Sequence, residues 1–279
     1  MKSSFRPLIT LVSGAAFFLL SNASFAAGDC SPAHKFSTIT PGVLTVATYS
    51  LPPFSMPVSG SEVKGVDGDI LKLIAAKECL KLQFAEGDAS AVIQSIVSGK
   101  ADVGMGNWYR TAARAKVVGL SAPMYLDQMG IISKDGADSI AALQGKRVGA
   151  VQGYLWTPDL QKVFGSSLTI YPTSVAMAQD LAAGRIDAGT ESYAVTIDGQ
   201  KKGGWQGLKV SIAKPDPRVA ASAQPGQTTL PYTKSNKELG DALSADVDAL
   251  NKSGEIAKIL GQNGLDPKAS EVGSPRLIQ

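Results

Sequence analysis

The chain has 279 residues, which is enough for one large domain or for two of ordinary size. Apolar residues make up 44% of it and charged residues 18%, a globular composition that excludes a disordered protein. The net charge of +3 is too small to indicate nucleic-acid binding, and two cysteines and one histidine are too few for a zinc cluster. We expect no cofactor and no metal.

The N-terminus has the pattern of an export signal. A positively charged start precedes an apolar stretch at 8–20, which is too short to span a bilayer comfortably, and small residues follow up to Ala27. We expect a signal peptide at 1–27 that is cleaved near Ala26 or Ala27. An uncleaved membrane anchor is the alternative.

Cys30 and Cys79 are the cysteines that remain after such cleavage. Exported proteins fold in an oxidising compartment, where paired cysteines form disulfides. The sequence therefore predicts a disulfide between Cys30 and Cys79, with two buried free thiols as the alternative.

Strands and helices alternate along the rest of the chain, which is typical of an α/β fold. The expected strands are 42–48, 101–105, 129–134, 145–152, 168–171 and 186–190. The expected helices contain 70–75, 92–97, 175–183, 239–250 and 256–260, and the last residues, 264–279, form a tail on the surface.

The stretch 104–114 combines the residue types of a small-molecule site. Its glycines let a ligand approach the backbone, and Trp108 and Tyr109 offer flat apolar faces. Thr111 is a candidate N-cap, and Arg114 could bind a carboxylate through a bidentate fork. An ordinary strand-to-helix turn with aromatic residues covering the core is the alternative.

An internal repeat links this stretch to a second part of the chain. Residues 96–104 and 181–189 share a helix end, a glycine, a basic residue and an aspartate before a short strand. Two similar α/β lobes that present equivalent strand ends would explain the match, and chance similarity is the alternative.

Several short motifs, in this order and spacing, resemble the extracellular solute-binding proteins of family 3, the periplasmic receptors of amino-acid-type ABC importers. The resemblance covers about 42–264. The motifs are Pro53-Phe54, Gly65-Val66-Asp67-Gly68-Asp69-Ile70, Ser98-Gly99-Lys100-Ala101-Asp102, Thr111-Ala112-Ala113-Arg114, Leu143-Gln144-Gly145-Lys146-Arg147-Val148-Gly149 with Gln152-Gly153, Ala183-Gly184-Arg185-Ile186-Asp187-Ala188, and Ser253-Gly254-Glu255-Ile256.

The resemblance implies an α/β fold of two lobes, the type II periplasmic-binding-protein-like fold, with the ligand cleft between the lobes. Lobe 1 would be discontinuous, at 40–126 plus 227–279, and lobe 2 would run over 127–226. The resemblance also implies a monomer in the periplasm that binds a small solute and delivers it to an ABC transporter permease in the inner membrane.

The resemblance assigns roles to individual residues of this chain. Arg114 matches the arginine that grips the ligand α-carboxylate. Asn107 and Tyr109 fall in the segment that supplies polar contacts to the ligand. Tyr49 and Phe54 lie on the loop that supplies an aromatic wall.

Two positions depart from the family pattern. Gly153-Tyr154 stands where the family often has Gly-Thr or Gly-Ser, so a second hydroxyl for the carboxylate is missing. Ser192 stands at the usual aspartate for the ligand amine, so either its neighbour Glu191 binds the amine or the ligand is not a standard α-amino acid. Aromatic residues such as Trp108 and Tyr154 would suit a cationic or apolar ligand body.

Three functions remain open at this stage. A solute-binding protein needs no catalytic group, and the lone His34, expected at the surface, makes a Ser-His-Asp triad improbable. A cleft enzyme that resembles cyclohexadienyl dehydratases could use Glu191 as an acid if burial raises its pKa. The third is a ligand sensor that does not serve transport.

Overall fold

The computed structural model describes residues 30–278, so the predicted signal peptide at 1–27 lies outside the described residues. Strands and helices alternate as predicted. The helices are α1 (Val66–Lys77), α2 (Ala89–Val97), α3 (Ala112–Val117), α4 (Thr157–Phe164), α5 (Ser174–Ala182), α6 (Tyr193–Lys201), α7 (Ala220–Ala223), α8 (Lys237–Lys252) and α9 (Glu255–Gln262), with short 3₁₀ turns η1 (Ala141–Leu143), η2 (Gly165–Ser167) and η3 (Pro267–Ser270). Among residues 30–278, none of these helices has the length and apolar character that crossing a membrane requires.

The strands form two principal sheets and two small ones. They are β1 (Val43–Thr48), β2 (Met56–Ser59), β3 (Glu62–Lys64), β4 (Lys81–Glu86), β5 (Val103–Gly104), β6 (Trp108–Tyr109), β7 (Gly119–Leu120), β8 (Leu126–Asp127), β9 (Met129–Ser133), β10 (Val148–Val151), β11 (Leu168–Tyr171), β12 (Ala188–Ser192), β13 (Lys209–Ile212), β14 (Gly226–Thr229) and β15 (Pro231–Tyr232).

The first principal sheet has the strand order β4-β1-β5-β15-β7, and β1 runs parallel to both β4 and β5. Helix α2 packs on β1 and β5, α1 contacts β4, and α8 contacts β7. Leu44 and Val46 of β1 are fully buried in a core with residues of α1 and α8, whereas Ala47 packs in a separate core with Val92 and Ile96 of α2. The strand interior is apolar because helices cover both of its faces.

The second principal sheet has the order β11-β10-β12-β9-β13. Strand β10 runs parallel to β11 and β12, whereas β9 pairs antiparallel with β12 and β13. Helices α4 and α5 pack on β10, and α6 packs on β9 and β13. This sheet has its own core, which includes Ile131, Val148 and Leu160.

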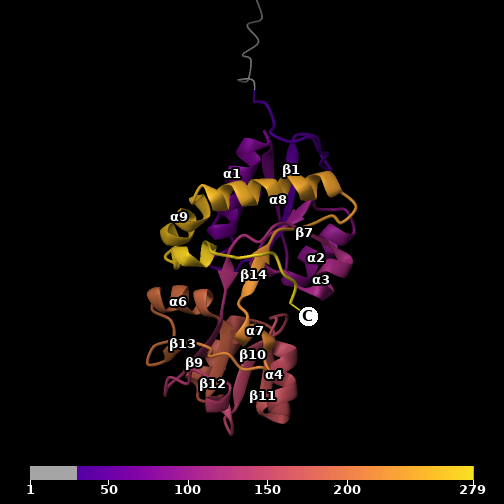
Figure 1. Cartoon of the computed structure of the whole chain (residues 1–279). Helices are drawn as coiled ribbons and strands as arrows, with labels where there is room; N and C mark the ends of the chain where they lie inside the picture. The colour runs from indigo at the N-terminus through magenta and orange to yellow at the C-terminus, as the bar shows by residue number, and fades with distance from the viewer. Residues whose placement is uncertain (1–29, 279) are drawn as a thin grey trace, which may run out of the picture. The chain divides into compact units, whose positions relative to one another are not determined.

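A small antiparallel sheet, β6-β14-β8, lies between the two groups of elements in Figure 1. It contains the chain segments that pass from one principal sheet to the other, at β8 and β14. The predicted fold class, an α/β fold of two lobes, is confirmed.

The internal repeat has a structural counterpart in the two sheets. The carboxylate of Asp102 accepts from the backbone N–H of Thr45, and the Asp102 N–H donates to the Thr45 carbonyl. Asp187 makes the same pair of hydrogen bonds with Arg147. In each lobe the aspartate therefore joins the strand that follows it to the first parallel strand, which explains why the same residue types recur.

Strand β4 was absent from the predicted elements. Only Phe84 of its six residues is buried, since the strand lies at the edge of its sheet. An edge strand with one buried side chain has too little apolar pattern to be predicted.

The predicted disulfide is confirmed. Cys30 and Cys79 are both disulfide-bonded, and the chain has no other cysteine.

The stability of the first lobe can be tested at Leu44. Replacement of this fully buried residue by alanine should lower the free energy of unfolding by about 2–5 kcal/mol, because it removes buried methyl groups and leaves a cavity. Leu73→Ala is the control, since Leu73 on α1 is exposed and its loss should cost roughly 0.5 kcal/mol or less. Equal losses in urea unfolding would contradict this account of the core.

Candidate functional site

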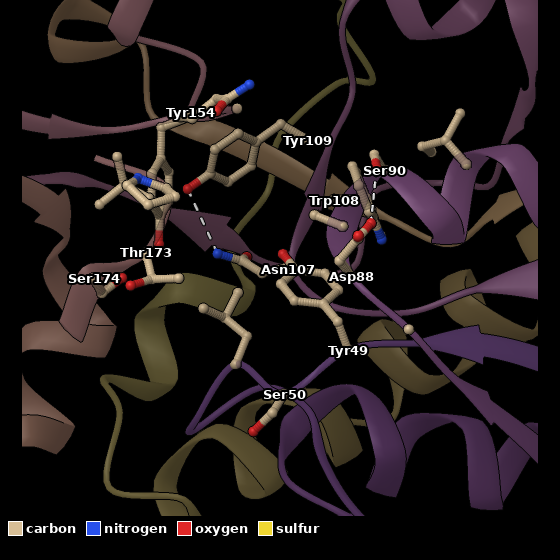
Figure 2. A pocket seen from close by; sticks show the side chains of 18 of the residues that line it. Tyr49, Ser50, Asp88, Ser90, Asn107, Trp108, Tyr109, Tyr154, Thr173 and Ser174 are labelled. Carbon is tan, nitrogen blue, oxygen red and sulfur yellow. Dashed lines mark hydrogen bonds between the residues drawn. The ribbon is translucent and has the colours of Figure 1, made fainter. Parts of the chain in front are cut away.

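A cavity of about 830 Å³ has walls from both lobes (Figure 2). Its volume lies within the range of small-molecule sites in proteins. The lining residues are Tyr49, Ser50, Leu51, Glu86, Gly87, Asp88, Ala89, Ser90, Ile93, Asn107, Trp108, Tyr109, Arg114, Val151, Gln152, Gly153, Tyr154, Pro172, Thr173 and Ser174. We call this cavity the cleft.

Arg114 lies in the cleft on the first turn of α3. Thr111 is the N-cap of this helix, as predicted, and its hydroxyl accepts from the Arg114 N–H at 3.1 Å. The Arg114 guanidinium lies 4.8 Å above the Trp108 ring and donates from Nη1 to the Tyr109 carbonyl at 2.9 Å. Its Nε and Nη2 groups have no hydrogen-bond partner within residues 30–278, so these donors remain for an anion.

Burial lowers the pKa of Arg114 from its ordinary value. The described residues place no carboxylate in an ion pair with this arginine. An anionic group of a ligand would therefore offset the cost of burying the cation, which favours a carboxylate at this point.

Aromatic rings form two walls of the cleft. Tyr49 meets Trp108 edge to face, with ring centroids 5.9 Å apart, and its hydroxyl donates to the Gly106 carbonyl at 2.8 Å. On the other lobe Tyr154 stacks on Trp156, with centroids 4.7 Å apart. Contacts within each ring pair hold the rings in place. Both sides of the cleft therefore present fixed aromatic surfaces to a flat or cationic ligand body.

The loop that carries Asn107 is held from behind by Asp67. Both Gly106 and Asn107 have positive φ values, 126° and 57°. Their N–H groups donate to Asp67 Oδ2, each at 2.8 Å, and the Tyr125 hydroxyl donates to Asp67 Oδ1 at 2.5 Å. Asp67 is fully buried on the first turn of α1, and the sequence pattern had indicated only a helix start there.

Asp127 fixes the side chains of the same loop. Its carboxylate accepts from Asn107 Nδ2 at 2.6 Å, from the Tyr109 hydroxyl at 2.5 Å and from the Ser192 hydroxyl at 2.9 Å. Burial raises the pKa of Asp127, while these three donors oppose the shift. Asp127 therefore links β8, the loop that contains Gly106 and Asn107, and the end of β12. We call this loop the binding loop. The sequence pattern did not indicate Asp127 as a site residue.

The Asp127 contact decides the orientation of the Asn107 amide. An ionised carboxylate only accepts hydrogen bonds, so the Asn107 nitrogen faces Asp127 and its oxygen faces away. Asn107 Oδ1 is buried and has no hydrogen-bond partner among the described residues. Asn107 itself lines the cleft and lies centrally in Figure 2, so an acceptor without a partner lies at the cleft wall.

The prediction for Phe54 was wrong. Phe54 is 1% exposed, stacks on Tyr125 with centroids 5.5 Å apart, and does not line the cleft. The loop after β1 folds back through hydrogen bonds between Leu51 and Ser55, which places Tyr49 toward the cleft and Phe54 in the core.

Glu191 lies behind the cleft wall. Glu191 is fully buried. It does not line the cleft, although the sequence predicts that it could bind the ligand amine. Oε1 accepts from the Ser192 N–H at 2.9 Å, and Oε2 has no hydrogen-bond partner within residues 30–278. Burial raises the pKa of Glu191 to about 7. The neighbouring Tyr154 does line the cleft, as does Gly153, at φ 86°.

Polar groups at two helix starts also line the cleft, and the sequence had not singled them out. Asp88 caps α2, where it accepts from the Ala91 N–H at 2.7 Å. Thr173 caps α5, and Ser174 follows it in the lining. The hydroxyls of Thr173 and Ser174 therefore line the same cleft as Tyr154, where the family motif often supplies a hydroxyl and this chain does not. Only the fold shows that these residues lie together.

The C-terminal tail runs over the surface, as predicted, and its end is tied to the loop that carries Asn107. Ile278 donates to the Arg110 carbonyl at 3.0 Å and accepts from the Ala112 N–H at 2.8 Å. The side-chain amide of Gln227 on β14 binds backbone groups of Val272, Ser274 and Arg276, each at 2.8 Å. The tail thus connects β14 to the segment before Arg114 (Figure 1).

Glu191→Gln should change how stability depends on pH. The pKa of folded Glu191 rises from 4.5 to about 7, so the folded state keeps a proton that the unfolded state gives up in this interval. The wild type should therefore lose about 3 kcal/mol of unfolding free energy as pH rises from 4.5 past 7. Glutamine should not show this loss in urea unfolding. The exposed Glu86→Gln is the control, and parallel pH profiles for all three proteins would refute the assignment.

Removal of residues 273–279 should loosen the binding loop. Ala112 loses the acceptor that Ile278 supplies, so amide hydrogen exchange over 106–115 should become at least about tenfold faster, while exchange in β10–β12 stays unchanged. A chain that lacks only Gln279 is the matched control. Unchanged exchange in the loop would show that the tail does not hold it.

Comparisons with known proteins agree with this geometry. Residues 44–264 match the family model of the bacterial extracellular solute-binding proteins, family 3. The Probable amino-acid-binding protein YxeM of Bacillus subtilis is 27% identical over 239 residues, which is 82% of this chain and 87% of that protein. The Histidine-binding periplasmic protein of Salmonella typhimurium is 26% identical over 166 residues, 56% of this chain and 61% of that protein.

Among solved structures, an ancestral arginine-binding protein bound to arginine matches with a TM-score of 0.67 and 25% identity over 79% of this chain and 97% of that chain. The family match covers most of the chain and includes the cleft residues that both lobes supply. The chain therefore belongs to the bacterial extracellular solute-binding proteins, family 3.

Proposed function

We propose that this protein captures a small amino-acid-like solute in the cleft and delivers it to an ABC transporter permease. The observation that carries the proposal is Arg114, whose Nε and Nη2 donors are free of partners within the described chain and which lies against Trp108 in a cleft lined by both lobes. The names of the relatives, an amino-acid-binding and a histidine-binding protein, support this class of ligand.

The proposed binding mode assigns one role to each group. The ligand carboxylate binds the guanidinium of Arg114. Asn107 Oδ1, buried and without a hydrogen-bond partner among residues 30–278, accepts from the ligand amine. The ligand body lies among Tyr49, Trp108 and Tyr154, which suits a cationic or an aromatic side chain.

We assign the lobes as 40–126 plus 227–279 for lobe 1 and 127–226 for lobe 2. The crossing strands β8 and β14 support these limits, since they connect the two principal sheets. Ligand that contacts both lobes stabilises the closed arrangement over the open one.

We place the protein in the periplasm as a monomer. The export signal expected at 1–27 and the periplasmic relative support this location. The partner is the permease in the inner membrane, and binding and release of the solute need neither a cofactor nor nucleic acid.

The dehydratase alternative receives less support from the site. Its acid, Glu191, has a raised pKa but is fully buried behind the wall and does not line the cleft. A sensor without transport would use the same cleft, and only the partner protein would differ.

Arg114→Met should weaken ligand binding at least tenfold and up to a few hundredfold, because a charge-assisted hydrogen bond contributes about 1.5–3 kcal/mol. The ligand is first found by a thermal-shift screen of amino acids and related amines, and its affinity is then measured by calorimetry. Arg185→Met is the control, since Arg185 forms an exposed ion pair with Asp180.

Two outcomes would overturn the proposal. A screen in which no amino-acid-like compound raises the melting temperature would remove the proposed ligand class. Equal affinity of the Arg114 and Arg185 variants for a hit would remove Arg114 from the carboxylate site.

A further inference from the structure

We propose that His34, Glu78 and Asp246 form a binding site for one divalent transition-metal ion of the Zn²⁺ type. The site belongs to lobe 1, and none of its three residues lines the solute cleft. It does not depend on the proposed function, because no group of the cleft takes part.

Three separate segments bring the candidate ligands together. His34 precedes β1, Glu78 follows the last turn of α1, and Asp246 lies on α8. One ligand atom from each lies within 4.8 Å of the others. His34 Nδ1 is 2.8 Å from Glu78 Oε1 and 3.8 Å from Asp246 Oδ1. Ligand atoms of a tetrahedral zinc site lie roughly 3.4 Å apart, so only small shifts are needed.

One hydrogen bond already orients the Glu78 carboxylate. The backbone N–H of His34 donates to Glu78 Oε2 at 3.0 Å. This bond leaves Oε1 directed at the His34 ring, and it would persist with a metal in place. Hydrogen bonds of this kind to the second oxygen fix the ligands of protein metal sites.

The charges of the cluster favour a cation. The side chains of Glu78 and Asp246 are 0% and 1% exposed. Lys77 is the ion-pair partner of Asp246, with Nζ 2.5 Å from Oδ1, whereas Oδ2 has no hydrogen-bond partner within residues 30–278. Two buried carboxylates thus face one ammonium and one imidazole that is neutral when it binds a metal, so the cluster without an ion has a net charge of −1 and attracts a cation.

Solvent reaches the cluster through a second cavity. This cavity of about 430 Å³ is lined by His34 and Glu78, together with Phe36 and the chain around Pro41. It gives an ion a path to His34 and Glu78, two of the three ligands, and its volume leaves room for a water in a fourth position. Three protein ligands plus water is a common zinc arrangement.

The donor set selects the class of ion. One imidazole nitrogen with two carboxylate oxygens suits Zn²⁺ and similar transition ions, whereas Ca²⁺ and Mg²⁺ prefer oxygen ligands alone. The residue counts had argued against a zinc cluster of cysteines and histidines. Residue counts could not show that two carboxylates lie beside the lone histidine. The His34 side chain is half-buried.

Replacement of Lys77 distinguishes a metal site from a cluster of ion pairs that has only a structural role. Its ammonium binds the Asp246 oxygen that the metal needs, so it competes with the metal. Lys77→Met should therefore raise zinc affinity at least tenfold. If the cluster held only ion pairs, the same change would lower stability and create no response to zinc.

The test uses the mature protein without a histidine tag, after chelator treatment. Calorimetry and thermal shift with ZnCl₂ should show one ion per chain in the wild type and no comparable response to CaCl₂. His34→Gln should weaken zinc binding at least tenfold, and Lys77→Met should tighten it.

Several results would overturn the proposal. These are the absence of a saturable zinc response in both the wild type and Lys77→Met, or equal zinc affinity of the wild type and His34→Gln. A melting temperature of His34→Gln close to that of the wild type without zinc would show that the variant folds, and Asp246→Asn then provides the second ligand test.

Discussion

Two buried carboxylates hold the loop at Asn107 from opposite sides, and the cleft depends on them. Asp67 binds the main-chain N–H groups of Gly106 and Asn107, and Asp127 binds the side chains of Asn107 and Tyr109. A loop with positive φ at two successive residues has few conformations that protein contacts can stabilise. The hydrogen bonds offset both this backbone cost and the cost of burying the carboxylates. The ligand groups are therefore fixed before a ligand arrives, which reduces the entropy lost on binding.

The same network explains the main departure from the family pattern. Ser192, at the position where the family has an aspartate for the ligand amine, gives its hydroxyl to Asp127. The negative charge thus lies behind the cleft lining, and the residue that lines the cleft in front of it is Asn107, whose side chain is neutral. A neutral acceptor still binds an ammonium group. Compared with a carboxylate, it discriminates less strongly against a ligand with an uncharged donor.

The two lobes hold their cleft-facing strands with equivalent hydrogen bonds but present different side chains to the cleft. Asp102 and Asp187 make equivalent hydrogen bonds to Thr45 of β1 and to Arg147, the residue before β10. Lobe 1 then presents a cation, Arg114, and lobe 2 presents the start of α5 with the ring of Tyr154. In the proposed binding mode, an anion on the ligand is bound mainly by the lobe that contains α3, and closure brings the second lobe against the ligand body.

The sequence by itself determined the alternation of strands and helices, the two-lobed fold, the disulfide, and the position of Arg114 after its Thr111 cap. The alternation and the cap follow from local patterns, because apolar periodicity, caps and glycine turns act over a few residues. The two-lobed fold is what the resemblance to family 3 implies, and the disulfide follows from the expected export of a chain with two cysteines. The tertiary structure decided which side chains face the cleft. Phe54 and Tyr49 share one loop, yet the fold of that loop sends one to the core and the other to the ligand. Asp127 and the cluster at His34 acquire their roles from partners 18 or more residues away in sequence, as in Tyr109 with Asp127 and His34 with Glu78, and no local pattern specifies such contacts.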